Sequence, residues 1–154
     1  MTDPQRDKPP FLRLVRALVE AYQAFVEVDT ALLRPTGLTQ AQFDVIATLG
    51  NTEGFAMREL SAKTLIAKGT LTGVIDRLEK KGLVARATNP EDRRSFVVAL
   101  TAEGEALFQR IFPEHLARLD ALFEDMDDTR LDALREDLVE LRKQMLGPEK
   151  TGTG

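Results

Sequence analysis

At 154 residues, the chain can form one domain with a buried core, and its net charge of −4 argues against the uniformly basic surface of most nucleic-acid-binding domains. Its lack of cysteine excludes disulfides, thiolate metal sites and cysteine nucleophiles. There is no signal-peptide pattern and no apolar run near the roughly 18 residues of a membrane span, so we expect a cytoplasmic protein with no membrane partner.

Aliphatic residues and alanine dominate the apolar content and Trp is absent, which favours a mostly α-helical fold. Residues 1–10 and 147–154 are rich in Pro, Gly or charge and lack periodicity, so we expect disordered tails there. The first helix is predicted over residues 11–33. Its apolar side chains recur in steps of four and three, interrupted by Asp29, and Pro35 stops it.

Three shorter helices are predicted next. Thr39 is the expected N-cap of a helix over residues 40–49, and residues 57–65 can form a second helix. The third begins at Gly69 or Thr70 and ends at a glycine that can take the left-handed conformation, Gly82.

That third helix has two different faces. Its apolar residues fall at i, i+3, i+4 and i+7, so one stripe packs inward. The opposite face is small and polar near the start of the helix. The inward stripe is Leu71, Val74, Ile75 and Leu78, and the remaining surface includes Thr70, Thr72, Gly73, Asp76 and Arg77.

A β-hairpin is predicted directly after this helix. The runs LVARAT and SFVVAL are rich in β-branched and apolar residues, and NPEDRR forms the loop between them. This loop presents Arg93 and Arg94 to solvent or to a partner. Between residues 57 and 96 the local net charge is +4, which leaves −8 for the rest of the chain. A basic segment on an acidic scaffold is typical of a local polyanion-binding surface.

The C-terminal part returns to helical periodicity. Thr101 is the expected N-cap of a helix that Pro113 kinks or breaks, and a last helix begins at about Asp128. The lone His115 is interpreted as an exposed or capped side chain, because no His or Cys lies near it at metal-ligand spacing. Neither a metal nor a cofactor is expected. The acidic cluster at residues 124–128 is explained most simply as a link with acids at a helix N-terminus, although it could bind a cation weakly.

Two short helices followed by a basic hairpin indicate a winged helix-turn-helix. An α-helix fits the major groove of duplex DNA, where Thr70 and Thr72 can offer hydroxyls and methyls to base edges. Lys68 adds a charge beside a helix N-terminus that favours phosphate. Arginines on the wing tip suit the minor groove.

These residues resemble the MarR family of bacterial transcription regulators. The similarity is specific in the run LIAKGTLTGVIDRLEKKGLVARATNPEDRRSFVVALTAEG and extends more loosely over residues 11–146. The matching positions are Thr70 or Thr72, Arg77, Leu78, Glu79, Gly82, Leu83, Val84, Asp92, Arg94, Val98, Leu100, Thr101 and Gly104.

The resemblance implies a homodimer that binds a pseudo-palindromic DNA operator, usually as a repressor released by a small molecule or by oxidation. It also implies that Arg94 enters the minor groove and that Asp92 helps hold the wing. From the residues alone, Asp92 could equally cap its own turn. The third helix is also similar to that of the family's organic-hydroperoxide sensors, which sense through a cysteine. This chain has none, so only the ligand-responsive mode remains.

The resemblance and the periodicity together predict a DNA-binding lobe at residues 39–101, with dimerisation helices at residues 11–34 and 102–146. The apolar seams of these helices could instead belong to an intramolecular core. The predicted DNA-binding residues are Lys68, Gly69, Thr70, Thr72, Gly73, Arg77, Asp92, Arg93 and Arg94. A small aromatic or apolar effector is expected near Phe25, Phe43 and Ile46.

An enzyme is not expected. The sequence has no nucleophile elbow, phosphate loop, dinucleotide fingerprint or zinc-protease motif, and a single histidine restricts acid-base schemes. The alternative to a DNA-binding regulator is a winged-helix module that docks a protein and binds no specific DNA.

Overall fold

The computed structural model describes residues 8–147, apart from the side chain of Lys68. The predicted disordered tails therefore lie largely outside the described residues. The chain divides after His115 into two compact units. The elements are α1 (Pro10–Leu33), η1 (Arg34–Thr36), α2 (Gln40–Leu49), β1 (Phe55–Ala56), α3 (Met57–Lys63), α4 (Lys68–Lys80), β2 (Val84–Thr88), β3 (Phe96–Leu100), α5 (Ala102–Ala121) and α6 (Asp128–Leu146).

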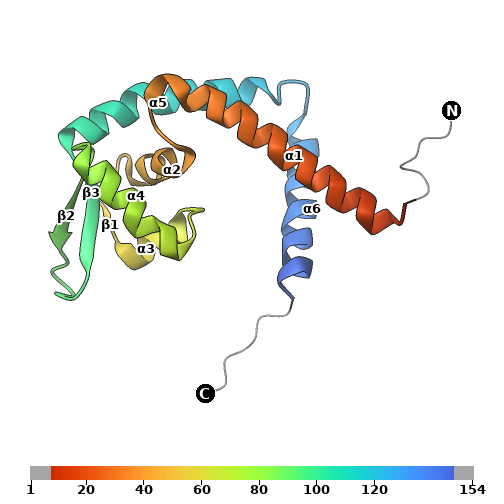
Figure 1. The fold of residues 1–154 in the computed structure, drawn as a ribbon. Helices are drawn as coiled ribbons and strands as arrows, with labels where there is room; N and C mark the ends of the chain where they lie inside the picture. The colour runs from red at the N-terminus through yellow and green to blue at the C-terminus, as the bar shows by residue number, and fades with distance from the viewer. Residues whose placement is uncertain (1–7, 148–154) are drawn as a thin grey trace, which may run out of the picture. The chain divides into compact units, whose positions relative to one another are not determined.

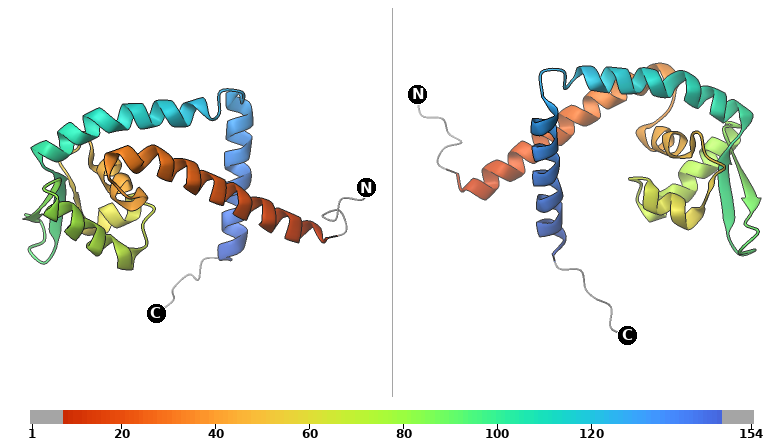
Figure 2. Two further views of the ribbon diagram at one scale, coloured as in Figure 1. Left: turned by 45° about the horizontal axis from the view of Figure 1, so that its top comes forward. Right: turned by 180° about the vertical axis from the view of Figure 1, so that it is seen from behind.

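Three helices and a small sheet form the centre of the first unit. Helices α2, α3 and α4 pack around one apolar core, and the strands pair antiparallel in the order β1-β3-β2. The predicted hairpin is confirmed, with Val84 opposite Leu100 and Thr88 opposite Phe96. Figures 1 and 2 show this hairpin projecting from the edge of the three-helix bundle. The observed arrangement is a winged helix-turn-helix within a mostly α-helical chain.

The core contains the apolar stripe predicted for α4. Because these side chains recur on one helical face, all four can face the same core, and each is nearly inaccessible to solvent. Val98 of β3 and Leu60 of α3 are fully buried in the same core. The stripe consists of Leu71, Val74, Ile75 and Leu78.

The expected helix signals act as predicted. The Thr39 hydroxyl accepts from the amide of Gln42, whose side chain accepts from the amide of Thr39, which completes a capping box at α2. Gly82 has a φ of 73° after α4, a conformation that L side chains rarely adopt. Thr101 caps α5 by accepting from Gly104 at 3.1 Å.

Three details differ from the sequence-based expectations. Pro113 lies inside α5, so a break there is wrong: the helix continues through it. The two-residue strand β1 was not foreseen, because pairing with the distant β3 creates it. Helix α3 ends at Lys63 rather than at residue 65, and α4 begins at Lys68, slightly earlier than predicted.

The second unit contains the end of α5 and the whole of α6. Asp127 caps α6 by accepting from the amide of Arg130 at 2.8 Å, which agrees with the simple interpretation of the acidic cluster. None of the described residues beyond His115 is buried. Large apolar side chains of this unit, including Leu122, Leu138 and Met145, are about half exposed. This part of the chain therefore has no core of its own.

Helix α1 also exposes apolar side chains. Phe11 and Tyr22 are about two-thirds exposed, and Val15, Val19 and Phe25 are nearly half exposed. No helix among the described residues is long and apolar enough to cross a membrane.

Candidate nucleic-acid interface

The first half of α4 presents an open, polar face. Gly69, Thr70 and Thr72 are exposed there, and Arg77 is exposed one turn further along the helix. The N-cap residue is Ala67, whose side chain cannot bond to the first amides of the helix. The amide of Thr70 donates to the Ala67 carbonyl oxygen at 2.8 Å, and no side-chain oxygen caps the helix start.

No packing inside the protein requires the two glycines of this face. A Cβ atom on Gly69 would meet no heavy atom within 4 Å, and one on Gly73 would meet only the Arg77 guanidinium at 3.9 Å. Neither glycine has a positive φ. Glycine within a helix costs about 1 kcal/mol relative to alanine. Because nothing inside explains that cost, the absence of side chains here favours close approach from outside.

The turn before α4 is held by side chains. The Asp44 carboxylate on α2 accepts from the amide of Leu65 at 2.8 Å, and the Thr64 hydroxyl donates to the Leu60 carbonyl oxygen at 2.9 Å. These bonds anchor the turn to α2 and to the end of α3. Asp44 was not singled out from the sequence, because its partner lies 21 residues away.

The wing tip is shaped by its own polar side chains. The Asp92 carboxylate accepts from the amide of Arg94 at 3.0 Å, and the Asn89 side chain accepts from the amide of Glu91 at the same distance. The loop closes where the backbone amide of Asn89 donates to the backbone carbonyl oxygen of Ser95. Asp92 therefore acts at least as a cap of its own turn, and the loop it shapes carries the exposed Arg93 and Arg94.

Ion pairs made by one arginine join the wing to α4. Arg86 of β2 forms ion pairs with Asp76 and with Glu79, the latter at 3.2 Å. Its side chain is only 21% exposed, so this pair of contacts is better shielded than an ordinary surface ion pair. Arg86 was not predicted from the sequence. The available signal was a charged residue inside an apolar strand, with two acids one turn apart on the preceding helix.

His115 is buried, so its interpretation as an exposed or capped residue is wrong. Its side chain is 7% exposed, and Nε2 lies 3.1 Å from the carboxylate of Asp29 on α1. The other oxygen of Asp29 accepts from the Gln40 side chain at 2.6 Å, and the imidazole lies 4.3 Å from the Phe43 ring, centroid to centroid. This cluster links α1, α2 and α5. Asp29 interrupts the apolar seam because it serves this buried contact.

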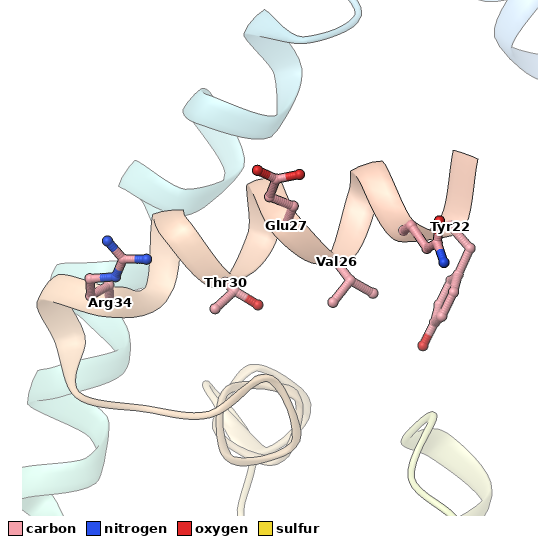
Figure 3. A pocket seen from close by; sticks show the side chains of 6 residues that line it. Tyr22, Val26, Glu27, Thr30 and Arg34 are labelled. Atoms are coloured by element: carbon pink, nitrogen blue, oxygen red, sulfur yellow. The ribbon is translucent and has the colours of Figure 1, made fainter. Parts of the chain in front are cut away.

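The residues predicted to hold an effector lie in different environments. Ile46 is fully buried in the lobe core, Phe43 is half-buried beside His115, and Phe25 is exposed on α1. A separate open groove of about 330 Å³ runs along α1. Its lining combines aromatic, apolar and charged side chains, with Tyr22, Val26 and Thr30 on one side of the helix (Figure 3). Gln23, Glu27 and Arg34 complete it.

Residues 8–147 contain no group of three or more His, Cys, Asp and Glu side chains that could hold a metal ion. The helices α3 and α4, the connecting turn and the β2-β3 wing define the class of this protein, which is a winged helix-turn-helix protein.

Comparison with known proteins identifies the family. A model of the MarR family matches residues 38–96. The transcriptional regulator FarR of Neisseria gonorrhoeae is 32% identical over 126 residues, which are 82% of this chain and 86% of FarR. The chain belongs to the MarR family of transcription regulators, which confirms the resemblance and the expectation that it is not an enzyme.

Two solved structures are informative neighbours. The transcriptional repressor CouR, bound to a 23-mer DNA duplex, is 27% identical with a TM-score of 0.70. NadR in complex with 4-hydroxyphenylacetate is 29% identical with a TM-score of 0.68. Both similarities cover 93% of this chain and 99% of the other.

Proposed function

We propose that this regulator binds a pseudo-palindromic operator in duplex DNA as a homodimer, with α4 in the major groove and the wing in the adjacent minor groove. The observation that carries this proposal is the open face of α4, where no packing inside the protein requires Gly69 or Gly73. The exposed arginines of the wing lie on the same unit. CouR, a relative of similar fold, is a repressor seen on a DNA duplex. We assign this chain the same kind of activity, in the cytoplasm.

The proposed contacts divide into two kinds. Thr70 and Thr72 read base edges, whereas Lys68, Arg77 and the N-terminal amides of α4 bind phosphates. Arg94 enters the minor groove, Arg93 contacts the backbone beside it, and Asp92 keeps the loop in shape.

The exposed apolar surface supports the proposed homodimer. The described residues beyond His115, 116–147, have no buried side chain, and α1 presents a row of exposed aromatic and aliphatic groups. An exposed apolar patch of this kind marks an interaction site. A second copy of the chain supplies a matching surface by symmetry, and two lobes related by a twofold axis read two half-sites.

Selection of binding sequences from a random duplex library tests the DNA proposal. We expect a twofold-symmetric sequence with half-sites about one helical turn apart. Thr72→Ala should change the preferred bases inside each half-site, because it removes a base-edge contact and no charge. If the selection enriches no sequence and binding is weak at all salt concentrations, the result would contradict the proposal and favour a protein-docking module.

We further propose that a small aromatic acid releases the DNA. The groove along α1 joins an aromatic wall at Tyr22 to the charged groups of Glu27 and Arg34, and Phe25 lies on the same helix. Ile46 belongs to the lobe core and Phe43 packs against it, and we expect these two α2 side chains to respond when an effector binds. NadR, a neighbour of similar fold, binds 4-hydroxyphenylacetate. The effector acts only through different affinities for the DNA-competent and DNA-incompetent arrangements.

A panel of hydroxylated benzoates and phenylacetates, each beside its methyl ester, tests this proposal. The acids should weaken operator binding, and Arg34→Gln should reduce that effect for the acids more than for the esters, because it removes the cation that pairs with the carboxylate. Release by peroxide with no response to any acid would contradict it.

A further inference from the structure

Phe96, the first residue of β3, is a large aromatic side chain at the base of the wing, and it is 50% exposed. It directly follows the loop that carries Arg93 and Arg94. The DNA-binding residues predicted from the sequence do not include it, and the proposed dimer surfaces on α1 and α6 do not contain it.

The strand register places Phe96 on the face of the hairpin that is directed toward α4. Side chains alternate across a strand, so Phe96 shares its face with Val98, which is fully buried in the core with the α4 stripe. Arg86 lies opposite Val98 on the same face, and its guanidinium pairs with Asp76 and Glu79 of α4. Phe96 lies one step further toward the loop, where the core ends. It therefore borders the space between α4 and the wing tip.

We propose that Phe96 contacts the deoxyribose groups of the DNA strand that separates the two occupied grooves. This inference rests on the proposed function. With α4 in the major groove and Arg94 in the next minor groove, one sugar-phosphate strand must cross the space that Phe96 borders. The arginines of the adjacent loop complement the phosphates of that strand, and the aromatic ring complements the C–H faces of its sugars. The residues from 57 to 96 carry a net charge of +4, which suits a nucleic acid rather than another apolar partner.

The role assigned to Phe96 is positioning. A sugar contact carries no base information, so it fixes how deeply the wing and the helix sit on the duplex without changing the preferred sequence. It also releases no counterion, so its contribution to affinity does not depend on salt concentration. This salt independence separates Phe96 from Arg94.

Fluorescence anisotropy with the selected operator at three salt concentrations tests the inference on the full-length chain. Phe96→Ala should weaken binding about tenfold per half-site, the scale expected for the loss of about half a buried aromatic side chain. The slope of log affinity against log salt should stay at the wild-type value, whereas Arg94→Ala should reduce it by about one unit per half-site. Phe96→Leu should recover part of the loss, because leucine keeps an apolar contact.

Val97→Ala is the matched control. Val97 lies on the opposite face of the same strand and is half-buried, so its truncation also removes apolar surface from the hairpin. Its affinity should stay within about twofold of wild type. Thermal melting of each variant shows whether the fold is intact.

Several outcomes would overturn the inference. Wild-type affinity in Phe96→Ala would leave the ring without a role in binding. A reduced salt slope in Phe96→Ala would mean that the ring only presents Arg94. A loss that depends on the base step would indicate a wedge between bases instead of a sugar contact. If the wild-type chain shows no salt-dependent DNA binding, the proposed function fails together with this inference. If the wild-type chain binds the operator and Phe96→Ala binds it equally well, only this inference fails.

Discussion

At single residues of α4, a substitution that stabilises the helix is expected to weaken DNA binding. Gly69 lies in a helix, where alanine would be favoured, and the space beyond its Cα is open. The same open space is where the proposed DNA backbone and bases approach. A methyl group there affects the free protein and the complex in opposite directions.

Gly69→Ala is expected to raise the free energy of unfolding by up to about 0.5–1 kcal/mol and to weaken operator binding by about 1 kcal/mol or more. Gly37→Ala is the contrasting variant. Gly37 has a φ of 70°, so alanine there should lower the free energy of unfolding by about 1 kcal/mol. The DNA affinity of the folded Gly37→Ala variant should stay at the wild-type value. Denaturant unfolding and operator titration of both variants check the prediction. Unchanged DNA affinity in a stabilised Gly69→Ala would show that the face is not in contact with DNA.

The buried pair of Asp29 and His115 gives a second prediction at the residue scale. Asp29→Ala leaves His115 buried without its acceptor, so we expect a loss of about 3 kcal/mol in the free energy of unfolding. Asp29→Asn should recover part of this, because its amide oxygen still accepts. Arg16→Ala breaks a pair whose side chains are each 56% exposed, and it should cost at most about 0.5 kcal/mol. Equal losses in Asp29→Ala and Arg16→Ala would contradict a structural role for the cluster.

Among the elements, the wing and α4 are connected by Arg86, so we expect them to move as one piece. Arg86→Ala should lower stability by about 1 kcal/mol, since the contact is only partly shielded, yet weaken operator binding further because the hairpin is no longer held beside α4. Arg86→Lys should rescue only part, because lysine cannot bridge two acids with a planar fork. Amide hydrogen exchange of the hairpin checks the cause. Faster exchange with undiminished DNA affinity would rule out the coupling.

The elements also show what the sequence could and could not predict. The boundaries of α2 and the inward stripe of α4 follow from local signals, namely Thr39 and apolar spacing, and both are confirmed. Strand β1 exists only because Phe55 and Ala56 pair with residues about 40 positions later. Asp29 and His115 look like isolated polar residues until the fold joins them. Long-range contacts between single polar groups leave no periodic pattern, so Arg86, Asp44 and this pair escaped prediction.

For the whole molecule, the exposed apolar side chains support the proposed self-association. The described residues beyond His115 bury no side chain, and we propose that this part of the chain gains its apolar burial from a second copy. Light scattering should give the mass of a dimer at micromolar concentration, and Leu138→Glu together with Met145→Glu should lower both that mass and the melting temperature. These two side chains are 54% and 57% exposed in the single chain. A stable monomer that binds a palindrome tightly would contradict the proposed dimer.

We propose that α4 and the wing form a DNA-binding surface with Arg94 in the minor groove. Operator affinity at two salt concentrations for the wild-type chain and Arg94→Ala, together with circular-dichroism melting, tests this surface. We expect wild-type affinity to fall steeply with salt. Arg94→Ala should melt like the wild type, because the side chain is exposed, and should bind more weakly by about 1–3 kcal/mol per half-site with a shallower salt slope. Arg94→Lys should recover only part of the loss, since lysine lacks the planar fork and is more strongly hydrated. Unchanged affinity and slope in a normally folded Arg94→Ala would contradict the claim and make Arg94 an ordinary solvated turn residue.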